Sequence, residues 1–358
     1  MEVLVIMVSF SADKGYSNHP IGLGPDGPFP RAALTHHLDR RWLHYAFLSR
    51  DGKCAMVANA AWLGPPLKSC DKRERFTTIL LLHDDTQGWH ASQFNADIST
   101  PHWSAFALPH AHDRPARLDI AAPTKHPKVA LKLWRSSRPC TSQSAFFAQH
   151  QHLRWQSETG VYGSGEIHIG KSRKNVEFVG YHERVRGRWG WPDLGEWVFG
   201  FANDLNAPPG KPPEWSGVFT FIRPVSGKAE EQASFMLWRK GRLVRHFPRR
   251  NVSFAVRGSL SRDDVTMVPS LPGLLGTPAA SMVPRRLMIT AILGNDHVVL
   301  DFDGETAARI VIPSETSYKP FSVHEVLGGC HMHGEVNGEK FQIETRGIVE
   351  FAGGATHD

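Results

Sequence analysis

Residues 166–191 read EIHIGKSRKNVEFVGYHERVRGRWGW, and this stretch decides the fold class. Two runs rich in β-branched and apolar residues, Glu166–Ile169 and Val176–Val179, flank the turn Gly170-Lys171-Ser172. Short runs of this kind on either side of a glycine-containing turn are typical of a β-hairpin. If the second strand continues to Trp191, its side chains alternate between two faces of a sheet.

The same pattern of short strands and turns extends in both directions from this hairpin. Aromatic or β-branched runs alternate with Gly, Asn or Asp turn signals. The expected strands cover residues 42–48, 54–62, 76–83, 129–134, 197–201, 218–222, 234–238, 243–247, 287–293, 297–302 and 341–344. Few windows keep an apolar i, i+3, i+4 pattern for the length of a helix, and Thr141–Gln156 is the best helical candidate. Strands about 8–12 residues apart favour a sandwich or a barrel.

The length of 358 residues suggests two domains, because one domain takes roughly 150 residues. The Pro-rich stretch 207–213 is the expected seam. We therefore expect an all-β protein of two antiparallel β-barrels packed side by side. The expected division is an irregular Gly/Pro-rich arm at 1–31, a first barrel at 32–206 and a second barrel at 207–358.

The composition, 41% hydrophobic and 21% charged, is that of a globular chain and excludes a disordered or fibrous one. No apolar run approaches the ~20 residues that a membrane-spanning helix needs. The apolar start 1–10 lacks the basic region and cleavage site of a signal peptide. The four cysteines form no CxxC pair, and a chain of this size builds its own core without disulfides. These features predict a reduced, cytoplasmic protein.

Residues 180–191 concentrate polar and aromatic side chains and form the candidate site. On a strand, its two faces carry His182, Arg184 and Arg186 on one side and Tyr181, Glu183 and Val185 on the other. A histidine and a carboxylate beside guanidinium groups, walled by tryptophans, suit proton transfer, because burial raises the pKa of a carboxyl group. A buried salt-bridge network that locks two barrels together is an equally good interpretation.

Four motifs along the chain have a recognisable order. They are the aromatic strand Arg41–Phe47 before Asp51-Gly52, the stretch Gly180-Tyr181-His182-Glu183 before Trp189-Gly190-Trp191, Asp204 soon after Trp197–Gly200, and the ending 334–338 with 347–351. Together they resemble the carotenoid 1,2-hydratase (hydroxyneurosporene synthase) and AttH-like family over about residues 38–352. The resemblance implies two lipocalin-like β-barrels with an apolar cavity for hydrophobic substrates. It implies no metal or redox cofactor.

Two positions depart from the family pattern. The hydratases read Tyr-His-Asp-His, whereas this chain has Glu183 at the aspartate and Arg184 at the second histidine. Glu183 keeps an acid but moves it by one methylene. Arg184 is a permanent cation and therefore does not donate a proton at neutral pH. An anionic or polarised substrate, such as a polyketide enolate, fits these residues better than a carotenoid.

The resemblance also suggests a role for each residue of the site. Glu183 or Asp204 is expected to be the acid, with His182 orienting it. Arg184 or Arg186 is expected to stabilise developing negative charge. The expected substrate contacts, whose π faces can also stabilise a carbocation, are Tyr181, Trp189, Trp191 and Trp197.

Other signals are weaker. His331 and His333 lie on one side of a strand, but spacing identifies no third ligand, so we assign no metal. The basic hairpin 239–250, in a chain of net charge +6, fits a solvated outer face, with contact to an anionic membrane surface as the alternative. No recognised nucleic-acid-binding module accompanies the charge, so no nucleic-acid partner is expected.

The predicted function is a cofactor-independent conversion of a hydrophobic, unsaturated metabolite such as a polyketide, an isoprenoid or a polyene. The enzyme would be a cyclase (including cycloaddition), a hydratase or an isomerase of secondary metabolism. The alternative from another class is a non-catalytic binder or carrier of such molecules. A titratable acid deep in the cavity favours the enzyme, and a purely apolar pocket favours the carrier. The oligomeric state stays open.

Overall fold

The computed structural model describes residues 34–65, 74–97, 116–121, 127–146, 151–190, 195–208, 210–224, 231–268, 282–312 and 321–354. Within these ranges the chain forms strands, apart from two short 3-10 helices, Arg249–Asn251 and Arg262–Asp264. The expected arm at 1–31 lies outside the described residues. No helix in the described ranges is long and apolar enough to span a membrane.

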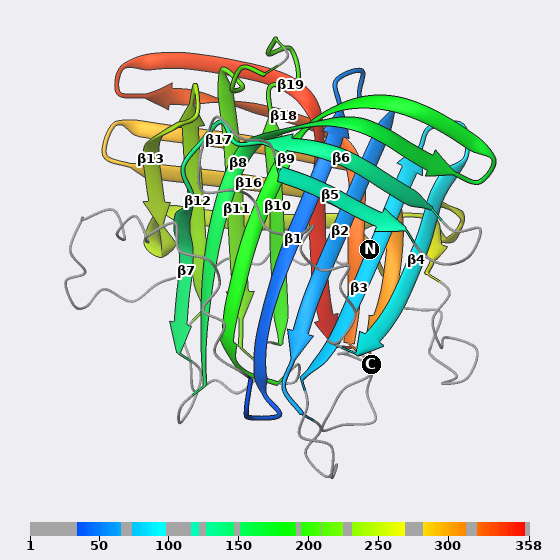
Figure 1. Cartoon of the computed structure of the whole chain (residues 1–358). Coiled ribbons are helices and arrows are strands. Elements are labelled where there is room, and N and C mark those ends of the chain that lie inside the picture. Colours follow the sequence, from blue (N-terminus) through cyan, green and yellow to red (C-terminus); the bar gives the residue numbers. More distant parts are fainter. Residues whose placement is uncertain are drawn as a thin grey trace.

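The strands form two curled sheets that pack against each other (Figure 1). The first sheet contains β1 (Asp39–Ser49), β2 (Cys54–Leu63), β3 (Arg75–Asp84), β4 (Gly88–Asp97), β5 (Ala116–Ala121), β6 (Lys128–Trp134), β7 (Cys140–Phe146), β8 (His152–Ile169) and β9 (Ser172–Arg188). The second contains β10 (Glu196–Asn203), β11 (Trp215–Arg223), β12 (Gln232–Arg239), β13 (Arg242–Pro248), β14 (Val252–Ser259), β15 (Val265–Met267), β16 (Pro284–Leu293), β17 (Asp296–Ile312), β18 (Phe321–Val336) and β19 (Glu339–Gly354). The predicted all-β architecture of two lipocalin-like half-barrels is confirmed.

The two sheets repeat one topology. The first has the order β4-β3-β2-β1-β9-β8-β6-β5, and the second has the order β13-β12-β11-β10-β19-β18-β17-β16-β14. In each sheet a four-stranded meander begins next to the long last strand of that half. Strand β9 therefore corresponds to β19, and β1 corresponds to β10. All the strand pairs are antiparallel except β15 with β17.

Three hydrophobic cores follow from the alternation of side chains along the strands. One core fills the interior of the first half-barrel and includes Tyr45, Phe47 and Phe178. A second fills the interior of the other half-barrel and includes Phe219 and Phe302. The third lies between the two sheets and combines residues from both of them. We call this third core the intersheet core, and it positions the candidate site.

The helix predicted at Thr141–Gln156 is wrong. Strand β7 covers the first part of this segment, and β8 begins at His152 and runs through the rest. Leu153 and Trp155 are buried and Arg154 is half-buried, which is the two-residue period of a strand. Tertiary pairing decides this outcome, because Leu153 to Ile169 pair residue by residue with β9.

The change from one sheet to the other falls between β9 and β10. The division expected at 206/207 places β10 with the first barrel, whereas β10 pairs with β11 and β19 in the second sheet. The Pro-rich stretch instead forms part of the β10–β11 connection, where the Lys211 amide donates to the Pro208 carbonyl at 3.0 Å. Proline suits this loop because it has no backbone N–H to donate to a neighbouring strand.

Candidate active site between the two sheets

Two cross-strand pairs of ionisable residues face each other in the intersheet core. In the first sheet His44 of β1 lies directly opposite Glu183 of β9. In the second sheet Glu325 of β18 lies directly opposite Glu350 of β19. His44, Glu183 and Glu325 are 2–3% exposed, and Glu350 is partly exposed. Phe199 of β10 joins the two halves, because its ring lies 5.9 Å from that of His44.

Glu183 is held by three donors from the first sheet. The indole N–H of Trp42 donates to Oε1 at 2.8 Å, and the indole N–H of Trp155 donates to Oε2 at 2.6 Å. The Tyr181 hydroxyl donates to the same Oε2 at 2.9 Å. Behind Tyr181, Ser157 lies 2.7 Å from the phenol oxygen and extends the hydrogen-bonded chain away from the carboxyl group. The carboxyl group is therefore fixed in position.

Burial raises the pKa of Glu183 to about 8, and the nearby Glu350 carboxylate raises it as well. The three hydrogen bonds act in the opposite direction, because they stabilise the ionised form. The balance leaves the carboxyl group protonated at neutral pH. Such a carboxylic acid still has its proton at pH 7. Hydrogen-bond donors are also in place to stabilise the carboxylate that forms when the proton is transferred. Both properties suit general acid catalysis.

The second sheet supplies a coupled pair of carboxyl groups. Burial raises the pKa of both Glu325 and Glu350, and the raised pKa is most pronounced for Glu325, which donates a hydrogen bond to Glu350. The indole N–H of Trp197 donates to Glu350 Oε1. Two carboxylates this close do not both ionise, so the pair holds a proton. Burial lowers the pKa of His44 to about 3, and this imidazole is therefore neutral.

Glu183 and Glu350 occupy equivalent places in the repeated topology. Glu183 on β9 receives an indole hydrogen bond from Trp42 on β1, and Glu350 on β19 receives one from Trp197 on β10. The first strand of each half reads Trp-x-His or Trp-x-Phe, and the last strand reads Gly-x-x-Glu. Each half therefore contributes one tryptophan–glutamate pair to the site. His44 occurs only in the first half and Glu325 only in the second.

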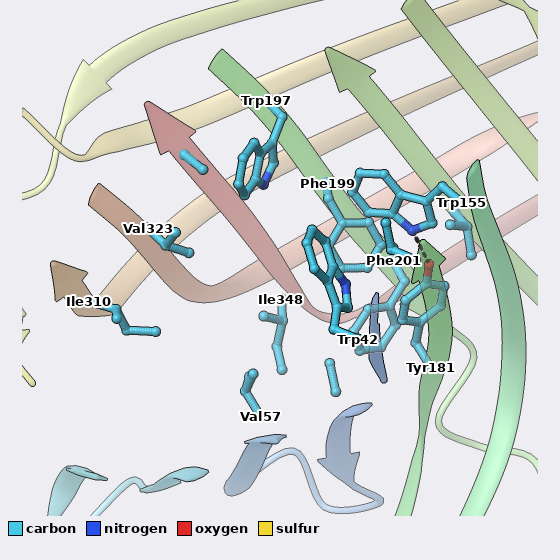
Figure 2. Packing of buried hydrophobic residues seen from close by; sticks show 14 of the residues in the cluster. Trp42, Val57, Trp155, Tyr181, Trp197, Phe199, Phe201, Ile310, Val323 and Ile348 are labelled. Carbon is cyan, nitrogen blue, oxygen red and sulfur yellow. Dashed lines mark hydrogen bonds between the residues drawn. The ribbon is translucent and has the colours of Figure 1, made fainter. Parts of the chain in front are cut away.

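Aromatic side chains surround Glu183. Trp42, Trp155 and Tyr181 gather with Phe199 and Phe201 on one side of the intersheet core, whereas the aliphatic side chains of Ile310 and Val323 lie apart from them (Figure 2). The ring of Tyr181 lies 4.7 Å from that of Phe199 across the sheet boundary. The surroundings of the acid are therefore apolar and rich in π faces.

Four of the predicted site residues lie in the intersheet core: Tyr181, Glu183, Trp189 and Trp197. Trp189 packs edge-on against Trp42 with ring centroids 5.4 Å apart. Trp197 contacts the second carboxyl pair rather than Glu183. Trp191 lies outside the described residues.

His182 does not orient Glu183, contrary to expectation. The two residues are neighbours on one strand and so point to opposite faces of the first sheet. His182 stacks on Tyr45 at 4.3 Å inside the first half-barrel, and its Nδ1 lies 2.9 Å from the His44 carbonyl oxygen. Burial and the nearby Arg184 guanidinium lower the pKa of His182 well below its ordinary value. This imidazole is neutral and acts in packing.

Arg184, Arg186 and Asp204 also lie apart from Glu183. The Arg184 Nε–H donates to His182 Nε2 at 3.4 Å on the interior face of the half-barrel, and Arg186 on the same face is exposed. Asp204 follows β10 and accepts a hydrogen bond from the Asn206 amide at 3.0 Å, as in an Asx-turn.

The interior of the first half-barrel holds a separate buried ion pair. The Arg135 Nε–H donates to Glu158 Oε1 at 2.6 Å, and both side chains are 1% exposed. Glu158 lies directly opposite His182 in the β8–β9 register. The two opposite charges neutralise each other inside the half-barrel, on the face of β9 that carries His182 and not on the face that carries Glu183.

Sequence reasoning missed His44, Glu325 and Glu350. An imidazole nitrogen of His44 and carboxylate oxygens of the two glutamates lie within 4.8 Å of one another. His331 and His333 do share one side of β18, with ring centroids 4.9 Å apart. The sequence does contain a signal for Glu350. The second half repeats the two motifs of the first half, Trp-x-aromatic on its first strand and Gly-x-x-Glu on its last strand.

The fold has counterparts of known structure. A protein described as a candidate AttH from Nitrosomonas europaea has a TM-score of 0.61 at 14% identity, covering 94% of this chain and 99% of that one. Kievitone hydratase from Nectria haematococca has a TM-score of 0.53 at 11% identity, covering 95% of each chain. CghA has a TM-score of 0.54 at 10% identity, covering 97% of this chain and 98% of that one.

These likenesses define the class of fold, two lipocalin-like sheets, and confirm the predicted distant resemblance to AttH-like proteins at the level of the fold. They extend over nearly the whole chain in each case. No protein-family model matches the sequence, and no curated protein matches it.

The raised pKa of Glu183 predicts a pH dependence of stability. Between the unfolded pKa of 4.5 and the folded pKa of about 8, the folded chain binds more protons than the unfolded one, so stability falls as pH rises. The loss is about 1.4 kcal/mol per pH unit. Glu183→Gln removes this slope, so its free energy of unfolding should rise relative to that of the wild type from pH 5 to pH 8. Urea denaturation at several pH values measures it.

The matched control is Glu177→Gln, which changes an exposed glutamate on the same strand. Its free energy of unfolding should stay parallel to the wild-type curve over the same range. A Glu183→Gln curve that is also parallel would mean that Glu183 is already ionised at pH 5.

Proposed function

We propose that this protein is an enzyme that uses Glu183 as a general acid on a hydrophobic, unsaturated small molecule, as a hydratase or cyclase. The observation that carries the proposal is the carboxyl group of Glu183, buried between the sheets, protonated at neutral pH and bonded to Trp42, Trp155 and Tyr181. No cofactor is required for this chemistry. We propose a polyketide, an isoprenoid or a polyene as the substrate class.

The residues around Glu183 suit each stage of a proton transfer. The carboxyl group donates its proton to one carbon of a double bond, and a cation develops at the other carbon. The π faces of Trp42 and Trp155 stabilise that cation. The same indole N–H groups, with the Tyr181 hydroxyl, stabilise the carboxylate left behind, and they are in place before the reaction starts.

The solved structures with the same fold support this direction. One of them is named a hydratase, for kievitone, and CghA has been solved together with Sch210972. Small organic molecules therefore occur with proteins of this architecture. For this chain we propose that the product is hydrated, cyclised or isomerised, according to what captures the cation.

A non-catalytic carrier is the second candidate. The large apolar intersheet core would serve a carrier as well as an enzyme. A carrier gains nothing from three buried carboxyl groups, since each costs free energy to bury and must be kept protonated or paired. The cluster of Glu183, Glu325 and Glu350 therefore favours the enzyme.

The test is an activity screen with mass detection. The purified chain is incubated with kievitone and with a panel of prenylated phenols, polyenes and polyketides, and the products are separated by liquid chromatography and mass spectrometry. We expect a product that has gained one water or an isomer with a new retention time, formed by the wild type and lost with Glu183→Gln. Tight binding with the starting material recovered unchanged across the panel would favour the carrier.

A further inference from the structure

Nε2 of His44 and Oε2 of Glu325 are among the buried polar atoms that have no partner within the described residues, and both side chains are about 2% exposed. An unpaired buried polar atom is unfavourable, so two of them in one cluster favour a bound ligand. Their residues come from different sheets, and the His44 and Glu325 ligand atoms lie within 4.8 Å of each other and of a Glu350 oxygen.

The ligand that fits these atoms is small and forms several hydrogen bonds. A buried water needs two to four polar partners, and this cluster offers an imidazole nitrogen and two carboxyl groups. His44 is neutral, and the Glu325–Glu350 pair shares a proton through a hydrogen bond. The imidazole nitrogen and the carboxyl oxygens are therefore the atoms of this cluster that can accept a proton from a bound water.

The environment of the pair sets the direction of proton flow. Glu325 donates to Glu350, which also accepts from the Trp197 indole, so Glu350 is the better placed of the two carboxyl groups to hold a negative charge. The described groups that act on this charge are Glu183 and His44 from the first sheet and Glu325 from β18. None of them is a cation at neutral pH, and the charge of Glu350 is thus available to accept a proton.

We propose that His44, Glu325 and Glu350 bind and activate the water molecule that captures the cation formed by Glu183, which makes the protein a hydratase. This inference rests on the proposed function and selects hydration from its alternatives. The water bonds to His44 Nε2 and donates to Glu325 Oε2. Glu183 is the cross-strand neighbour of His44 in the first sheet, so the acid lies beside the water site.

The atoms balance without a co-reactant. The Glu183 proton forms a new C–H bond as the double bond opens, and a lone pair of the water forms the C–O bond at the other carbon. The proton lost from that oxygen passes to Glu325 Oε2, while the proton that Glu325 held passes to Glu350. The product is the alcohol, Glu183 is a carboxylate and Glu350 is protonated. Transfer of that proton to Glu183 restores the resting state.

The first test is a high-resolution crystal structure of the full wild-type chain, with metal analysis of the same sample. We expect one ordered water within hydrogen-bond distance of His44 Nε2 and Glu325 Oε2, and no stoichiometric metal. An anomalous signal from a bound metal ion at this place, or a dry site, would overturn the proposal. This crystallographic test needs no substrate, and the proposed function does not depend on its result.

The second test uses the active substrate from the panel in water enriched with oxygen-18. The wild type should place the label in its product. Glu350→Gln should lower hydration at least 100-fold and shift the remaining product toward the unhydrated isomer, because the cation then loses a proton instead of capturing water. A structural defect alone would lower the rate without changing this ratio. Glu344→Gln, an exposed glutamate on the same strand, is the matched control and should keep the wild-type rate and ratio.

The outcomes distinguish failure of the water site from failure of the proposed general acid. Loss of turnover with Glu183→Gln together with a wild-type hydration rate in Glu350→Gln overturns the water site and leaves the acid in place. An unlabelled product isomeric with the substrate does the same. Wild-type turnover in Glu183→Gln overturns the proposed function itself.

Discussion

Glu183→Gln should lower kcat by about 100- to 10,000-fold while the dissociation constant of the substrate stays within a few-fold of wild type. This range is the usual contribution of a positioned general acid. The glutamine amide keeps the shape of the side chain and accepts hydrogen bonds from Trp42 or Tyr181 at its oxygen. It has no acidic proton to give. Single-turnover kinetics and tryptophan fluorescence titration measure the two quantities on the same preparation.

Two further variants make this result specific. Glu183→Asp keeps a carboxylic acid that is one methylene shorter and should recover part of the activity. Glu177→Gln on the same strand should leave both quantities unchanged. If Glu183→Gln weakens binding and lowers stability in equal measure without a selective loss of kcat, the hydrogen-bonded cluster is structural.

The second large effect concerns the other face of β9. Glu158→Gln should destabilise the fold by about 3–5 kcal/mol, because it leaves the Arg135 guanidinium buried without its counter-ion. Both side chains are 1% exposed, so solvent does not compensate. The midpoint of urea denaturation measures the change. The native fraction should bind substrate and turn it over as the wild type does, since the intersheet core is intact.

Arg173→Met is the control, because it breaks an ion pair with Glu166 in which the arginine is 72% exposed. Its effect on the free energy of unfolding should be below about 1 kcal/mol. If Glu158→Gln were as stable as the wild type and failed to bind substrate, the ligand would occupy the interior of the first half-barrel. The catalytic assignment would then move from Glu183 to the His182 face.

The sequence predicts many of the strands because their signals are local, but the expected strands omit β4, β5 and β14. The turn at Gly170 and the period-two burial of β9 depend on residues within one hairpin, so the alternation also separates His182 from Glu183 correctly. The Thr141–Gln156 segment failed because its pairing partner, β9, is what makes it a strand. Its own residues fit a helix about as well as a strand.

Only part of the site could be predicted, because local sequence patterns do not show which distant strands come together. Tyr181, Glu183 and Trp189 lie in one window, and a motif identifies them. His44, Glu325 and Glu350 come from three other strands, and only the register of each sheet and the packing of the two sheets bring them together. Asp204 stands close to the right strand in sequence, but it follows the end of β10 and its side chain bonds within a turn.

The central claim is that Glu183 carries a proton at neutral pH in the intersheet core. Infrared difference spectroscopy of the wild type minus Glu183→Gln, titrated in heavy water, tests it most directly. We expect a protonated-carboxyl band that belongs to Glu183 and disappears with a midpoint near pH 8. A carboxylate band already complete at pH 6 would contradict the claim, because Glu183 would then have no proton to donate.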